Sequence, residues 1–149
     1  MSKYKTIEDY PNYEVNKKGV VRSKERVYLN QFGKSNKVKP RIVLKTYLTT
    51  SGYLQVDLCK NAKYKKMSVH RLVALYFVKG FVEGYEVNHI DCDKTNNHRS
   101  NLEWVTSKEN KQHAWANGLY PPMTEAQRLA RSANGKLNKG RKRKTSCVP

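Results

Sequence analysis

The segment Glu86–His113, EVNHIDCDKTNNHRSNLEWVTSKENKQH, decides the fold. It holds a short apolar run that ends at His89, then a polar loop, a second apolar run from Leu102, and a stretch with helical character. Asn101 follows His89 by twelve residues, and Asn110 follows Asn101 by nine. The order strand, loop, strand, helix therefore predicts a small ββα unit that contains a histidine and two asparagines.

Local signals set the limits of these elements. We expect strands at residues 85–90 and 102–106. Thr106 and Glu109 have the T-x-x-E spacing of a capping box, and Gly118 stops the helix that this box opens. A second cap signature, Thr124 with Gln127, predicts a short helix over residues 125–133.

In the part of the chain before this segment, the spacing of apolar residues changes from every second position to the spacing of a helix. Alternation of apolar and polar residues around Leu54–Leu58 predicts a half-buried antiparallel hairpin between residues 41 and 69. After Ser68, apolar residues at helical spacing predict a core helix that Gly80 ends. His70 and Arg71 lie off the apolar stripe of that helix.

The first part of the chain, YKTIEDYPNYEVNKKGVVRS, predicts a strand, a turn at residues 17–19 and a second strand. Val15, Val20 and Val21 would build a small sheet there. The tail NGKLNKGRKRKTSCVP is too polar to bury a core.

Charge and length indicate the class of partner. The chain has 149 residues, with 30 Lys and Arg against 12 Asp and Glu, and a pI near 9.9. This charge, interleaved with ten tyrosines, favours nucleic acid as the partner. No apolar run approaches the roughly 20 residues of a membrane span, and the start lacks the apolar core of a signal peptide. We therefore expect a soluble, intracellular protein without a membrane partner.

The charge is concentrated on both sides of the ββα segment. Nine basic residues and one acid lie in 34–66, and eight basic residues and one acid lie in 119–149, whereas 83–110 has six acids and three bases. Two basic arms that bind phosphates would thus flank a centre able to hold a cation. Each basic run is equally consistent with solvated surface.

Metal and disulfide chemistry are limited by the cysteine pattern. The three cysteines, Cys59, Cys92 and Cys147, form no CxxC pair, so neither a disulfide framework nor a four-cysteine zinc site is supported. A zinc site made by His89, Cys92, His98 and His113 has no common spacing, although it stays open as an alternative.

The motifs VHRLVA, VNHID and NLEWVTSKEN, in this order, resemble the HNH endonuclease family, in particular its phage and intron-borne homing subgroup. The N-terminal pattern resembles a nuclease-associated module, with Tyr4 at a position where tryptophan is usual. The run GKLNKGRK resembles a short DNA-binding repeat. The resemblance implies an endodeoxyribonuclease that hydrolyses phosphodiester bonds in double-stranded DNA.

Hydrolysis of a phosphodiester needs a base for the attacking water and a cation for the departing oxygen. His89 is the candidate base, since imidazole titrates near neutral pH. The resemblance implies that Asn101 hydrogen-bonds across the loop to hold that base, and that Asn88 and Asn110 bind the metal. Oxygen ligands suit Mg²⁺ or Mn²⁺, although two neutral amides bind a cation less tightly than a carboxylate would.

Three further side chains of the segment remain ambiguous. Asp91 and Asp93 would be extra ligands or, more often, turn residues. Cys92 occupies a position where the family usually has glycine, so the freedom of glycine at positive φ is lost there. His113 lies one turn after Asn110, and would either touch the scissile phosphate or face solvent.

We thus expect an α+β protein: a small antiparallel β module at 1–50 that binds DNA, a ββα-metal nuclease domain at 51–118, and a basic helical or extended arm at 119–149. One active site per chain implies a nick by a monomer, whereas a double-strand break would need a dimer or two nicks. The candidate DNA-binding residues are Lys45, Lys60, Lys63, Lys65, Lys66, His70, Arg71, His113, Arg128, Arg131, Lys136, Lys139, Arg141, Lys142 and Arg143. Two alternatives stay open: an HNH-fold protein that binds DNA without cutting it, and, less favoured, a basic RNA-binding protein of ribosomal type.

Overall fold

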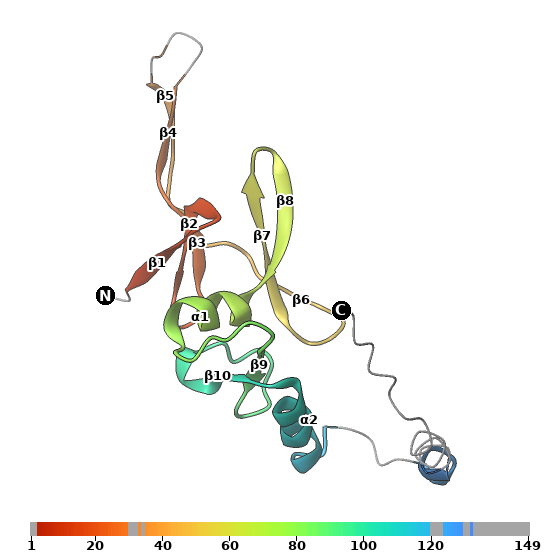
Figure 1. The fold of residues 1–149 in the computed structure, drawn as a ribbon. Helices are drawn as coiled ribbons and strands as arrows, with labels where there is room; N and C mark the ends of the chain where they lie inside the picture. Colours follow the sequence, from red (N-terminus) through yellow and green to blue (C-terminus); the bar gives the residue numbers. More distant parts are fainter. Residues whose placement is uncertain (1–2, 30–32, 34, 120–123, 130–131, 133–149) are drawn as a thin grey trace, which may run out of the picture. The chain divides into compact units, whose positions relative to one another are not determined.

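The structure is a computed structural model that describes residues 3–29, 33, 35–119, 124–129 and 132. The chain divides into two compact units, Met1–Asn117 and Gly118–Pro149. Figure 1 shows the order of the elements, from the N-terminal strands in red and orange to the helix that ends the first unit. Small antiparallel sheets and a few helices make up the first unit, which confirms the predicted α+β class.

The N-terminal sheet is built from three antiparallel strands. Their order is β1-β2-β3, and their bounds are β1 Tyr4–Ile7, β2 Tyr10–Asn16 and β3 Val21–Ser23. The chain returns beside β3, where the N–H of Ser23 donates to the carbonyl of Ile42 at 2.8 Å and the N–H of Leu44 to that of Val21 at 2.9 Å. The turn between β2 and β3 contains Gly19, which has a φ of +85°.

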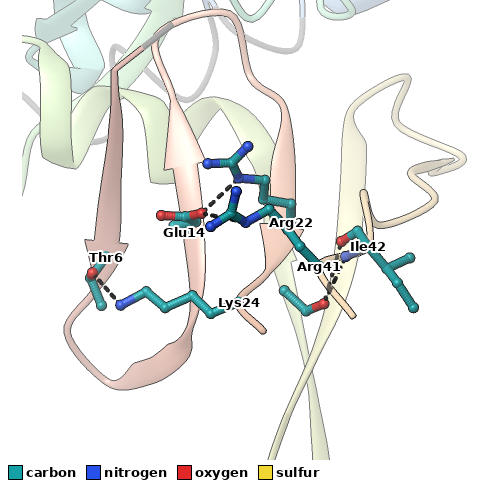
Figure 2. A network of polar contacts seen from close by, with 7 residues as sticks. Thr6, Glu14, Arg22, Lys24, Arg41 and Ile42 are labelled. Atoms are coloured by element: carbon teal, nitrogen blue, oxygen red, sulfur yellow. Dashed lines mark hydrogen bonds and ion pairs between the residues drawn. The ribbon is translucent and has the colours of Figure 1, made fainter. Parts of the chain in front are cut away.

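The outer face of this sheet carries a charged network, seen in Figure 2. The Nε of Arg22 donates to Oε1 of Glu14 at 2.6 Å, and Nε of Arg41 lies 3.8 Å from the same oxygen. The guanidinium of Arg22 also stacks on the ring of Tyr4, 3.4 Å from its centroid. Two arginines therefore share a single carboxylate on this face.

Two further strand groups follow. One is the hairpin of β4 Arg26–Leu29 and β5 Ser35–Lys39, which the sequence patterns above do not predict. The other is the sheet β6-β7-β8, whose strands are β6 Tyr47–Leu48, β7 Leu54–Lys60 and β8 Lys63–Ser68. Asn61 and Ala62, with φ of 51° and 59°, form the two-residue turn between β7 and β8.

The ββα unit follows helix α1 (Val69–Phe77), for which Ser68 is the N-cap residue. Strand β9 (Glu86–His89) pairs antiparallel with β10 (Leu102–Val105), and Leu102 lies opposite His89. A short 3₁₀ turn, Arg99–Asn101, leads into β10. Helix α2 (Ser107–Ala116) completes the unit.

The predicted capping box of α2 is present. The Thr106 hydroxyl accepts from the N–H of Glu109 at 3.3 Å, and the Glu109 carboxylate accepts from the N–H of Thr106 at 2.8 Å. In the second unit, Thr124 and Gln127 exchange the equivalent pair of hydrogen bonds at the start of the helical residues 125–129. Both helix starts are therefore determined by local sequence.

A single apolar core joins the N-terminal sheet to the ββα unit. Its buried members come from both halves of the first unit: Ile7, Tyr10, Tyr13, Val15, Val21, Val56, Leu58, Val69, Leu72, Val73, Ala74, Val87 and Leu102. Helix α1 contributes four of them. Because β2, β7 and α1 share this core, the strand that ends in His89 is positioned by residues from the beginning of the chain.

Candidate active site

His89 ends strand β9 and is buried, with 5% of its surface exposed. Its Nε2 lies 3.1 Å from Oδ1 of Asn97, a buried residue of the loop after the strand. The ring packs near two other rings, that of His70 with centroids 5.2 Å apart and that of Tyr53 at 5.9 Å. The candidate base is thus held on several sides by named contacts.

Asn101 ties the two ends of the loop together. Its Oδ1 accepts from the N–H of Asp91 at 3.0 Å, and its Nδ2 donates to Oδ1 of Asp91 at 2.8 Å and to the carbonyl of Asn96 at 2.9 Å. The carbonyl of Asn101 also accepts from the N–H of Ile90 at 2.9 Å. The bridge runs between the residues next to His89 and the start of β10.

The carboxylates of Asp91 and Asp93 accept hydrogen bonds within the turn that follows His89. Asp91 accepts from Asn96, Asn101 and the N–H of Asp93, and these hydrogen bonds, that of Asn96 foremost, lower its pKa. Asp93 accepts from the hydroxyl and N–H of Thr95, which lowers its pKa. Turn chemistry accounts for both residues.

The two candidate metal ligands each donate to a glutamate. Nδ2 of Asn88 lies 2.8 Å from Oε1 of Glu103, and Nδ2 of Asn110 lies 2.6 Å from Oε2 of Glu86. Hydrogen bonds from Asn110 and then Ser107 lower the pKa of Glu86, so this carboxylate is charged at neutral pH. In each asparagine the amide nitrogen therefore donates to a glutamate carboxylate. The amide oxygen is the atom that can bind a cation.

These residues fit a hard divalent cation. Amide oxygens are ligands that Mg²⁺ accepts, and the two glutamates add negative charge and fix the orientation of the amides by accepting from their nitrogens. Within the described ranges, no group of three or more His, Cys, Asp or Glu side chains could hold a metal, so the zinc alternative has no support there. Any metal held here would rely on the asparagine oxygens and on groups from the substrate.

A cavity of about 260 Å³ is bordered by Asn110 and Glu86. Among its lining residues are Tyr53, His70, Arg71, Glu86 and Asn110. The cavity thus brings together a candidate metal ligand, its carboxylate partner and an exposed arginine.

His70, which the sequence pattern places off the apolar stripe of α1, is nevertheless buried. The side chain is 6% exposed, and its Nδ1 has no hydrogen-bond partner within the part of the chain that the structure describes. Burial, followed by the nearby His89 and Arg71, lowers its pKa from 6.5 to about 4. Packing against Tyr53 and His89 covers a second face of α1 that the apolar pattern does not reveal.

Cys92 adopts the left-handed backbone that its position requires, with a φ of +64°. Its Sγ lies 4.0 Å from Nδ1 of His113, which is half-buried on α2. Cys59 and Cys92 are both free thiols. The turn is therefore kept without glycine, at the cost of local strain.

The predicted DNA-binding lysines of the central part are exposed. Four of them, Lys60, Lys63, Lys65 and Lys66, lie on the β7–β8 hairpin, and Lys45 precedes β6. Arg128 of the second unit is also exposed. Other predicted contacts lie outside the described residues: Arg131, Lys136, Lys139, Arg141, Lys142 and Arg143.

Sequence reasoning did not select Asn97 or the outer-face cations Arg22 and Arg41. Asn97 follows an exposed residue of the same type, Asn96, so nothing in the local pattern separates the two. The alternation of β2 and β3 could have indicated that Glu14 and Arg22 share the outer face.

Among the described residues, no helix has the length and apolar character needed to cross a membrane. Residues 68–112 match the HNH endonuclease family, and residues 3–59 match the NUMOD4 motif.

The chain is similar to DNA endonuclease I-HmuI of Bacillus phage SP01, with 38% identity over 70% of this chain and 59% of the relative. YosQ, a protein of Bacillus subtilis named as a putative HNH homing endonuclease derived from the SPbeta prophage, is 48% identical over 54% of this chain and 46% of the relative. Less than two thirds of the length of either relative is thus spanned.

A solved structure reported as DNA binding and cleavage by the HNH homing endonuclease I-HmuI superposes with a TM-score of 0.66 and 34% identity. The superposition covers 89% of this chain and 68% of the other. With the two matched segments and the ββα geometry around His89, these likenesses show that the chain belongs to the HNH endonuclease family and carries a NUMOD4 motif.

Proposed function

We propose that this chain is a metal-dependent homing-type endonuclease that hydrolyses phosphodiester bonds in double-stranded DNA and nicks one strand per monomer. The observation that carries the proposal is the ββα unit in which His89, Asn101 and Asn110 are each held by loop and strand contacts. Its relatives from a phage and a prophage, named as DNA and homing endonucleases, support the same substrate. An enzyme of this kind would work inside the host cell, where the DNA is.

In this mechanism His89 takes the proton from the attacking water. Asn101 keeps the loop closed so that the strand end that carries His89 holds its geometry. A divalent ion, Mg²⁺ or Mn²⁺, would be held by the amide oxygens of Asn88 and Asn110 and would neutralise charge on the departing 3′ oxygen. Glu103 and Glu86 hold those amides in place through their nitrogens.

Duplex DNA would be bound by cations outside this centre. The lysines of the β7–β8 hairpin, Arg71 beside the cavity, and Arg22 and Arg41 on the N-terminal sheet are exposed or partly exposed. The basic residues of 119–149 would extend the contact along the phosphates. His113 remains a proposed phosphate contact from α2.

A nicking assay on supercoiled plasmid tests the proposal. We expect relaxation with Mg²⁺ or Mn²⁺ and none with EDTA. His89→Ala should lose cleavage by on the order of a hundred- to ten-thousand-fold while keeping most of its DNA affinity. The matched control is His98→Ala, which removes a histidine from the same loop whose ring hydrogen-bonds to Ser100.

The outcome separates the enzyme from its main alternative. A catalytically inactive HNH-fold binding protein would retain DNA affinity in both variants and would relax no plasmid under any metal. Wild-type nicking rates in His89→Ala would remove His89 as the base.

A further inference from the structure

A row of three residues crosses the outer face of the N-terminal sheet. Thr6 of β1 lies opposite Glu14 of β2, and Glu14 lies opposite Arg22 of β3. Nε of Arg22 donates to Oε1 of Glu14 at 2.6 Å, and its guanidinium lies over the ring of Tyr4, 3.4 Å from the centroid. An ion pair on one edge and an aromatic ring on one face therefore hold this arginine.

These contacts leave the terminal nitrogens of Arg22 for another partner. Among the described residues, Nε is the nitrogen of Arg22 that donates to a side chain. The two terminal nitrogens form a planar fork that matches a pair of acceptors. The side chain is 21% exposed, so a partner can reach it. Because the guanidinium is already held in place, binding through this fork costs less conformational entropy than binding by a free arginine.

The face around Arg22 carries more positive charge than its carboxylate neutralises. Nε of Arg41 lies 3.8 Å from the same oxygen of Glu14, as Figure 2 shows. Nζ of Lys24 donates to the hydroxyl of Thr6 at 2.7 Å. These three cations share one carboxylate, and surface ion pairs add little stability. The excess charge favours a polyanion such as DNA as the partner of this face.

The carboxylate of Glu14 favours a base edge over a phosphate as the contact of Arg22. Arginine binds bidentately either to phosphate oxygens or to O6 and N7 of guanine. A carboxylate 2.6 Å from the guanidinium repels a charged phosphate but not the uncharged edge of guanine, and glutamate can also accept from N4 of cytosine. Arg41, whose side chain is 56% exposed, is better suited to a phosphate.

We propose that Arg22 is a specificity-determining residue that recognises one guanine in the major groove, and that Tyr4 and Glu14 position it. The N-terminal sheet, which lies in the NUMOD4 segment, then contributes to the choice of the target sequence in addition to affinity. The inference rests on the proposed function, because it concerns the DNA target of that enzyme.

Base preference measured by binding, without cleavage, tests this assignment. The full chain selects duplexes from a library with randomised positions in EDTA, and sequencing of the bound DNA gives the preference at each position. We expect one position at which guanine is preferred by on the order of tenfold or more. Arg22→Met, which keeps a long side chain over Tyr4 but removes the fork, should lose the preference at this position and keep the others. Tyr4→Leu should weaken the same preference in part.

Arg41→Met is the matched control, since it removes the same charge from the same face. It should lower the affinity for all sequences alike and leave the base preferences unchanged. The slope of log binding constant against log salt should become shallower by about 0.9 in this variant, but not in Arg22→Met.

A modified base supplies a measurement that needs no variant. 7-Deazaguanine lacks the N7 acceptor, and at the selected position it should weaken wild-type binding by on the order of tenfold. It should have no effect on binding by Arg22→Met, because the fork that reads N7 is gone.

Several outcomes would overturn the proposal. A uniform loss of affinity in Arg22→Met, with every base preference kept, would make Arg22 a phosphate contact, and an unchanged profile would make it part of a structural ion pair. If circular dichroism shows that Arg22→Met is unfolded, wild-type binding that tolerates 7-deazaguanine at every selected guanine overturns the assignment. Because the selection needs no metal and no cleavage, a failure of plasmid nicking would overturn the proposed function and leave this result intact.

Discussion

Asn110 on helix α2 donates to Glu86 on strand β9 at 2.6 Å, so the helix is joined to the strand that ends in His89. The bond uses the nitrogen of the amide and the carboxylate that borders the cavity. It thereby couples the position of a proposed metal ligand to the position of the proposed base.

The first prediction concerns this pair. Asn110→Ala should reduce nicking with Mg²⁺, and excess Mn²⁺ should restore part of the activity because Mn²⁺ binds oxygen and nitrogen ligands more tightly. Glu86→Gln should shift the metal titration in the same direction by a smaller amount, since it removes an orienting charge but no ligand. Gln112→Ala, an exposed position of the same helix, is the control. Identical metal titrations for Asn110→Ala and the control would leave Asn110 as a structural residue only.

The second prediction concerns pH and His70, whose pKa is lowered to about 4 by burial, His89 and Arg71. In the unfolded chain the imidazole is protonated below about pH 6.5, whereas in the folded protein it stays neutral down to about pH 4. The unfolded state binds more protons between these values. The free energy of unfolding should therefore fall as the pH falls through this window, by at most about 1.4 kcal/mol per pH unit from this residue.

Urea denaturation at several pH values measures this dependence. The His70→Gln variant should have a flatter profile between about pH 6.5 and pH 4, because the group that titrates is gone. A profile as steep as that of the wild type would mean that His70 is not the cause.

The third prediction concerns the strained turn at Cys92. Replacement by glycine removes the Cβ from a backbone with a φ of +64° and should raise the free energy of unfolding by up to about 1 kcal/mol, net of the entropy that glycine adds to the unfolded chain. Cys92→Ala removes the thiol but keeps the Cβ, so it should bring no such gain. Equal unfolding free energies for the two variants would show that strain is negligible there.

The fourth prediction concerns the basic arm. Truncation after Gly118 removes eight basic residues, and the slope of log binding constant against log salt should become shallower by about 0.9 for each phosphate that the arm neutralises in the full chain. The first unit, which ends at Asn117, should keep its circular dichroism and cleave at low salt. A double Lys63→Gln, Lys65→Gln variant of the full chain measures the contribution of the β7–β8 hairpin to the same salt slope. An unchanged slope in the folded truncation would place the phosphate contacts elsewhere.

Local signals make the ββα order predictable from sequence. The capping box of Thr106 and Glu109 needs only residues three apart, and the strands of the unit end where polar residues interrupt the apolar runs. For the same reason the sequence predicts the start of helix α1 after Ser68, although the helix ends at Phe77, a few residues before Gly80.

Contacts between residues that are far apart in the chain could not be predicted from the sequence. The burial of His70 depends on Tyr53 and His89, which are 17 and 19 positions away, and helical periodicity contains no information about them. Asn97 meets a turn nearly eighty residues earlier in the chain. Neither relationship has a periodic or compositional signal, since both arise from packing in three dimensions.

The core shared by β2, β7, α1 and β10 has a consequence for engineering chimeric nucleases. A graft that cuts the chain near residue 50 would separate Val15 and Val21 from Leu58 and Leu72, and would expose both halves of one apolar interior to water. Retargeting by exchange of parts should therefore succeed at a junction after Asn117, where the first unit ends, and fail within it unless the buried faces are redesigned together.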